Sequence, residues 1–136
     1  MISAEVEIKV EFYDVDPMHV VWHGNYARFL EVARGALLDK IGYNYPQMKA
    51  GGWSFPIVDM SFHYTRPAVH AQRLKVRATL VEWENRLKVD YLISDAPSGQ
   101  RLTKASTTQV AVKEPSGELS FASPPELVEQ VQRLLG

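Results

Sequence analysis

The sequence contains no cysteine. This absence excludes disulfide bonds, cysteine-ligated zinc and a cysteine nucleophile, and it is typical of proteins from a reducing compartment. Long apolar runs are also lacking, because the first twelve residues alternate charged and apolar side chains, unlike a signal-peptide core. No later stretch approaches the length of a membrane span. We therefore expect a cytoplasmic protein without a membrane span, whose chemistry uses oxygen and nitrogen groups.

An excess of positive charge is lacking too. Fifteen Lys and Arg face sixteen Asp and Glu, for a formal net charge of -1, so nucleic acid is not an expected partner. The chain also has no P-loop, no dinucleotide fingerprint and no Gly-x-Ser-x-Gly turn. Its 136 residues, 46% of them hydrophobic, suit one domain over residues 1–136.

Two different periodicities occupy the first third of the chain. Alternation predicts a strand that ends near residue 12 and buries Val6, Ile8, Val10 and Phe12. Residues 25–41 then carry apolar side chains at three- and four-residue steps, which predicts an amphipathic helix ending at Gly42. Its expected polar face consists of Arg28, Glu31, Arg34 and Asp39.

The rest of the chain has mostly strand character. Strand-like runs cover residues 55–66, 72–83, 86–95 and 101–113, and the turns between them predict antiparallel neighbours. Residues 43–54 have no clear pattern. A Ser123-x-x-Glu126 capping box predicts a last helix through Leu135. We expect an α+β fold in which the long helix covers the apolar face of one sheet.

The segment that joins the first strand to the long helix, FYDVDPMHVVWHGNY (residues 12–26), is rich in chemistry-bearing side chains. Pro17 forces Asp16 into extended backbone, and His23 follows seven residues later, beside an expected Asn25 cap. The start of a helix offers free N–H groups that stabilise an anion. Ordinary turn chemistry explains the same residues, and so does a metal site with His19, although Pro17 and Gly24 disfavour the helical spacing such a site needs.

Residues 13–26, followed by Phe29-Leu30-Glu31 and Ala33-Arg34, resemble the signature of the 4-hydroxybenzoyl-CoA thioesterase family, including the YbgC/FadM-like acyl-CoA thioesterases. The pattern Phe62-x-Tyr64-x-Arg66-Pro67-Ala68 extends the resemblance over most of the chain. It implies a hotdog fold, in which an antiparallel sheet wraps around a long central helix. It also implies hydrolysis of a thioester without a metal or another cofactor, by a homodimer or homotetramer.

The resemblance assigns Asp16 and His23 as the catalytic residues, with Asp16 as nucleophile or general base and His23 positioning Asp16 or binding the thioester or water. The expected substrate-binding residues are Tyr13, Val21, Tyr26, Phe55, Val58 and Arg66. The chain departs from the family at Met18 and His19, where small residues are usual, and at His70 and Ala71, where an acidic pair is usual. These departures bear on substrate preference.

Three other functions stay open at this point. The substrate can be an acyl-carrier-protein thioester in place of acyl-CoA. A hydratase or dehydratase on the same fold would use an aspartate and a histidine as acid and base. A non-catalytic protein could bind an acyl thioester in the same pocket.

Overall fold

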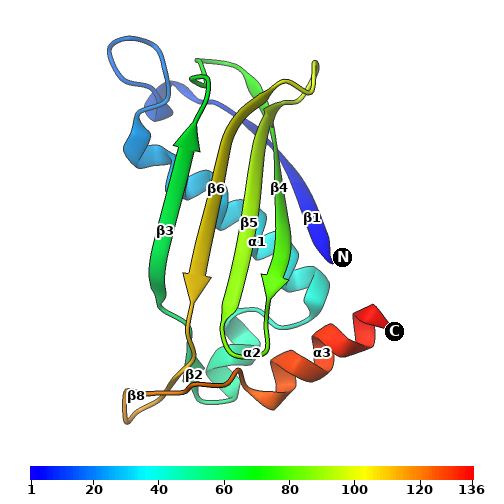
Figure 1. Cartoon of the computed structure of the whole chain (residues 1–136). Helices are drawn as coiled ribbons and strands as arrows, with labels where there is room; N and C mark the ends of the chain where they lie inside the picture. Colours follow the sequence, from blue (N-terminus) through cyan, green and yellow to red (C-terminus); the bar gives the residue numbers. More distant parts are fainter.

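The computed structural model describes residues 1–136, in which a long helix lies across one face of a five-stranded antiparallel sheet (Figure 1). The sheet has the strand order β1-β4-β5-β6-β3. Its strands are β1 (Ser3–Lys9), β3 (Ile57–Tyr64), β4 (Arg73–Glu82), β5 (Leu87–Asp95) and β6 (Arg101–Gln109). A small second sheet consists of β2 (Trp53–Ser54), β7 (Val112–Lys113) and β8 (Glu118–Leu119). The helices are α1 (Tyr26–Ile41), α2 (Tyr45–Ala50) and α3 (Pro125–Leu135).

The core lies between α1 and the inner face of the sheet. Every second residue of β4 and β5 is buried there, namely Leu74, Val76, Ala78, Leu80, Leu87, Val89, Tyr91 and Ile93. The α1 stripe that meets them includes Phe29, Leu30, Ala33 and Leu37, all fully buried. Each large apolar side chain buried in this way contributes about 1.5–3 kcal/mol. The predicted α+β arrangement, with the helix on the apolar sheet face, is confirmed.

One residue of the expected polar face of α1 lies in the core instead. Arg34 is 1% exposed. Its guanidinium donates to the hydroxyls of Tyr91 and Tyr45, each at 3.4 Å, and forms an ion pair with Glu31. Because position 34 follows Leu30 by one turn, it points inward, and the charge is tolerated there because its N–H groups have acceptors.

The first strand is shorter than the alternation predicts. It ends at Lys9, and Phe12 lies in a 3-10 turn (Phe12–Asp14) with 74% of its surface exposed. A reciprocal pair of contacts causes the turn, because the Glu11 N–H donates to Asp14 Oδ2 at 2.9 Å and the Asp14 N–H donates to the Glu11 carbonyl at 3.0 Å. The expected burial of Phe12 is therefore wrong.

The predicted pairing of consecutive strands fails between β3 and β4. β3 pairs with β6, whereas β4 lies between β1 and β5. Residues 65–72 cross the end of the sheet to connect them. The Ala68 N–H donates to the Tyr26 hydroxyl at 3.2 Å, and the Val21 N–H donates to the Ala68 carbonyl at 2.8 Å. This crossing segment therefore lies against the junction between β1 and α1.

Three further details differ from the sequence patterns. The patternless segment contains α2, whose Asn44 forms a capping box with Gln47. α3 begins after Pro124, and the Ser123 hydroxyl is buried without a partner instead of capping the helix. The run over residues 101–113 is divided into β6 and β7. None of the helices is both long and apolar enough to span a lipid bilayer.

Candidate active site

A hollow of about 350 Å³ opens at the N-terminal end of α1. One wall is the junction between β1 and α1, and the other is the end of β3 with the first residues of the crossing segment. Its lining residues are Asp16, Val20, Val21, His23, Tyr26, Tyr64, Thr65, Arg66 and Pro67. Five of the eight predicted site residues therefore meet in one place, namely Asp16, Val21, His23, Tyr26 and Arg66. We call this hollow the Asp16 pocket.

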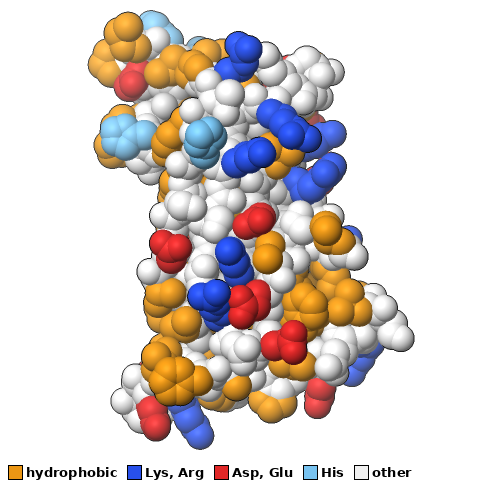
Figure 2. All heavy atoms as spheres, viewed as in Figure 1, with side chains coloured by type: hydrophobic (Ala, Val, Ile, Leu, Met, Phe, Trp, Pro, Cys, Tyr) orange, Lys and Arg blue, Asp and Glu red, His pale blue; other side chains and the backbone are white.

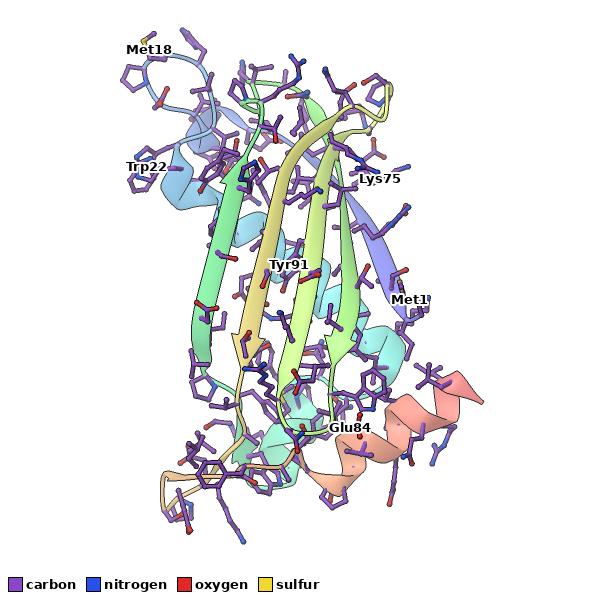
Figure 3. All side chains as sticks on the ribbon, in the orientation of Figure 1. Met1, Met18, Trp22, Lys75, Glu84 and Tyr91 are labelled. Atoms are coloured by element: carbon purple, nitrogen blue, oxygen red, sulfur yellow. The ribbon has the colours of Figure 1, made fainter.

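Asp16 is held by its own loop. Its Oδ1 accepts the Met18 N–H at 2.8 Å, and its backbone N–H donates to the Val20 carbonyl at 2.9 Å. Oδ2 has no partner in the protein. Met18 forms the tip of this loop, and its side chain points away from the molecule (Figure 3). The result is a half-buried carboxylate with one oxygen anchored and one free to act on a ligand.

The N-terminal end of α1, beside Asp16, has backbone N–H groups without acceptors. A 3-10 turn (His23–Asn25) leads into α1, and the backbone N–H groups of His23 and Gly24 donate to no acceptor in the protein. Asn25 does not cap the helix as predicted, because its side-chain amide donates to the Asp14 carbonyl at 2.8 Å instead. Two free N–H groups with the positive end of the helix behind them suit a developing oxyanion.

Asp14, two residues before Asp16, has a different environment. Its side chain is 2% exposed and accepts two hydrogen bonds from Arg28, at 3.2 and 2.7 Å. Its carbonyl accepts the Trp22 N–H at 3.0 Å as well as the amide of Asn25. Asp14 therefore ties the loop to the first turn of α1, and it does not line the Asp16 pocket.

The inner wall of the pocket is aromatic. Tyr26 is 3% exposed, and its ring centroid lies 5.0 Å from that of Tyr64. Phe62 stacks on Tyr64 with centroids 5.7 Å apart. Burial first, and the neighbouring Tyr26 second, raise the pKa of the Tyr64 phenol. The phenol stays protonated at neutral pH and can donate a hydrogen bond to a ligand. Tyr64 was not among the predicted site residues, although it belongs to the Phe62-x-Tyr64-x-Arg66 pattern.

Three predicted substrate residues lie away from the Asp16 pocket. Tyr13 is 62% exposed and packs against the Arg28 guanidinium. Val58 is exposed on β3, and Phe55 lines a separate hollow of about 520 Å³ between α2 and β2, at the opposite end of β3. A single chain does not bring these residues to Asp16.

The two histidines of the junction do not form a metal site with Asp16. No group of three His, Asp or Glu side chains in the chain is arranged to hold a metal ion. His23 lies beside the Trp22 ring, with centroids 5.0 Å apart, and makes no hydrogen bond to Asp16. His19 has a backbone φ of 64°, a left-handed conformation in which a small residue is favoured.

Residues 10–131 match the family model of the thioesterase-like superfamily. The chain is 33% identical over 112 residues to YneP of Bacillus subtilis, a protein assigned to the acyl-CoA thioesterases. The match covers 81% of this chain and 80% of YneP. It is 26% identical to the long-chain acyl-CoA thioesterase FadM of Escherichia coli, over 96% and 98% of the two chains. The structure superposes with a TM-score of 0.87 on the DHNA-CoA thioesterase of Staphylococcus aureus, at 27% identity over 99% and 92% of the chains.

Proposed function

This chain belongs to the thioesterase-like superfamily and is a hotdog-fold thioester hydrolase, and we propose that it cleaves acyl-CoA thioesters with Asp16 as the catalytic carboxylate. One observation carries the assignment of residues. Asp16, which has a free carboxylate oxygen, and His23, the first of the two residues with an unpaired N–H group at the start of α1, line the same pocket. A base or nucleophile and an oxyanion site are the two elements that hydrolysis of a thioester requires.

The geometry supports two routes. In one, the free Asp16 oxygen attacks the thioester carbonyl and the C–S bond breaks to release the thiolate. Water then hydrolyses the resulting anhydride, which gives the carboxylic acid, restores the Asp16 carboxylate and supplies the proton that the thiolate takes up. In the other, Asp16 takes a proton from water, the hydroxide attacks the carbonyl, and the departing thiolate receives the proton. In both, negative charge develops on the carbonyl oxygen, and the His23 and Gly24 N–H groups are the proposed donors to it. Each donor of this kind is worth about 3 kcal/mol.

A homodimer would complete the pocket. β3 is a free sheet edge with few charged residues, whereas the other edge, β1, carries Glu5, Glu7 and Lys9, which discourage pairing. Antiparallel pairing of two β3 strands about a twofold axis would bring the end of one strand beside the start of the other. The partner subunit's Phe55 and Val58 would then approach the Asp16 pocket, as their predicted role in substrate binding requires.

A hydrolysis assay tests this function. Wild-type protein and Asp16→Asn are incubated with a panel of short, long and aromatic acyl-CoA substrates, and free thiol is measured. We expect turnover of at least one substrate by wild type and a loss of about 10²- to 10⁴-fold in Asp16→Asn. Near wild-type turnover by folded Asp16→Asn would show that the assignment of Asp16 is wrong.

The proposed dimer and the expected cytoplasmic location rest on arguments separate from the assignment of Asp16. Size-exclusion chromatography with light scattering at micromolar concentration should give twice the mass of the chain or a multiple of it, and a monomer would contradict the shared pocket. A tetramer is compatible with it. Because acyl-CoA is an intracellular metabolite, the proposed substrate agrees with the expected cytoplasmic location.

A further inference from the structure

A hollow larger than the Asp16 pocket lies elsewhere on the molecule. It measures about 620 Å³ and lies on the outer face of the sheet, the face that α1 does not cover. Figure 2 shows this face, with basic side chains gathered over its upper part and acidic side chains lower down. The catalytic proposal assigns no role to this hollow.

The floor and the rim of this outer hollow are made of different residue types. Ser61, Ser106 and Thr79 are small hydroxylated residues on three different strands, and they leave the centre empty. Long basic side chains border it at Arg77, Arg101 and Lys104, with His63 beside Lys104 in the strand register. The outer hollow therefore offers hydroxyl groups below and positive charge along one side.

Only some of these charges are free. Arg77 is occupied by Glu5, with N–O distances of 2.8 and 2.6 Å. Arg101 and Lys104 form no ion pair. The one carboxylate of the lining, Asp90, lies between Thr79 and Ser106 in the strand register, two residues along β5 from the register partner of Lys104 and four from that of Arg101. At ~3.3 Å per residue this places it about 7 Å along the strand from Lys104 and about 13 Å from Arg101.

The outer hollow adjoins the Asp16 pocket at the end of β3. His63 borders the outer hollow, whereas the next residues, Tyr64 to Arg66, border the Asp16 pocket. The Arg66 N–H donates to the carbonyl of Leu102, the residue after Arg101, at 3.0 Å. A third exposed cation without an ion-pair partner, Arg66, therefore stands where the two hollows meet. A ligand that extends from the Asp16 pocket to the outer hollow passes over the end of β3 and not along its free edge. A dimer paired through β3 would therefore leave this path open.

We propose that Arg66, Arg101 and Lys104 form a phosphate-binding rim that holds the nucleotide end of coenzyme A over the outer hollow while the thioester occupies the Asp16 pocket. The inference rests on the proposed function. Coenzyme A carries a diphosphate and a ribose 3′-phosphate at the end of a long flexible arm, so anionic groups arrive at a distance from the reacting carbonyl. Arg and Lys bind such groups through charge-assisted hydrogen bonds. The rim would make the enzyme selective for CoA over carriers that lack these phosphates.

The test compares two substrates that share one acyl group. An acyl-CoA and the corresponding acyl-pantetheine, which has no phosphate, are assayed with wild type and with Arg101→Gln/Lys104→Gln. We expect the double variant to raise KM for acyl-CoA by about 20-fold, at roughly four- to fivefold for each exposed contact, and to leave the kinetics on acyl-pantetheine unchanged. The control Lys88→Gln/Lys113→Gln removes the same charge far from the rim and should change neither substrate. Equal KM values for acyl-CoA in wild type and the rim variant would overturn the proposal.

Binding separates this inference from the catalytic one. Isothermal titration of wild type and the rim variant with coenzyme A itself requires no turnover. Weaker binding by the rim variant supports the rim even if wild type hydrolyses no thioester, in which case the proposed function alone fails. Identical binding, or a defect limited to an acyl carrier protein substrate, would show that the rim does not hold the CoA phosphates. Added salt should weaken the binding of wild type more than that of the variant.

Discussion

The two ends of α1 are built in opposite ways. At the C-terminal end, Gly42 adopts a φ of 84°, and its N–H donates to the carbonyls of Leu38 and Asp39 at 3.0 and 3.1 Å. The Tyr43 N–H donates to the Leu38 carbonyl as well, at 3.1 Å. The last turn is therefore closed by the chain itself, a common way for a helix to end.

At the N-terminal end, the donors of His23 and Gly24 stay free and the expected cap, Asn25, is turned toward Asp14. Asp14 binds Arg28 and ties the preceding loop to this end of the helix, but the loop supplies no acceptor for the two N–H groups. One end therefore contributes to the stability of the helix, whereas the other keeps polar groups available beside Asp16. Substitutions at the two ends should separate stability from activity.

The largest effect on stability is expected from Asp14→Asn. The variant removes the buried negative charge and weakens both hydrogen bonds to Arg28. We therefore expect the free energy of unfolding, measured with urea, to fall by about 2–4 kcal/mol, together with lower turnover. Glu5→Gln breaks the exposed pair with Arg77 and should cost less than about 1 kcal/mol. If Asp14→Asn is as stable as Glu5→Gln, Asp14 does not anchor the loop.

Gly24→Ala should change activity more than stability. A Cβ at this position would lie 2.2 Å from the Trp22 ring, so either the ring or the backbone that carries the Gly24 N–H must shift. We expect kcat/KM to fall by about tenfold, the size of a partly misplaced oxyanion donor. The same change made in a Trp22→Ala background should cost much less, and an equal loss in both backgrounds would contradict this explanation.

Gly42→Ala is the matching change at the closed end. Because φ there is 84°, a side chain should cost about 1 kcal/mol of unfolding free energy and leave kcat/KM unchanged. Gly35→Ala is a control within the same helix, since no atom lies within 4 Å of the added Cβ, and it should stabilise by about 0.5–1 kcal/mol. A lower kcat in Gly42→Ala at unchanged KM would contradict the claim that the C-terminal end of α1 contributes only to stability.

The smallest effect is expected from His19→Gly. The left-handed backbone at His19 is strained for a residue with a side chain, and glycine removes that strain while it adds entropy to the unfolded chain. We expect the free energy of unfolding, measured by thermal denaturation, to rise by about 0.5 kcal/mol. His70→Gly, at a neighbouring position without positive φ, should destabilise instead, and a destabilised His19→Gly would show that its side chain contributes a contact.

The sequence predicted α1, its Gly42 end and the apolar sheet face, because these depend on periodicity and local backbone geometry. It also predicted the meeting of Asp16 with His23, since both flank the start of one helix. The strand order was not predictable from turn length, because residues 65–72 are held by Tyr26 and Val21, which lie far away in the sequence. The family and the thioesterase class, inferred from residues 13–26, are confirmed.

The environments of individual side chains were less predictable. Asp14 and Asp16 look alike in the sequence, yet one is buried by Arg28 and the other has a free oxygen. Arg34 was placed on the solvent face because charge usually indicates exposure, and Tyr91 and Tyr45 provide its acceptors only in the folded chain. The position of Phe55 and Val58 relative to Asp16 depends on a second chain, and that part stays a prediction.

The most direct test of the open helix end as a catalytic site is a paired measurement on Asp16→Asn, of kcat/KM on the best acyl-CoA and of the thermal unfolding midpoint. Asn retains the shape of Asp and can accept the Met18 N–H, so the loop should keep its fold. The account predicts a loss of about 10²-fold or more in kcat/KM with a midpoint close to that of wild type. Full activity in the folded variant would contradict it.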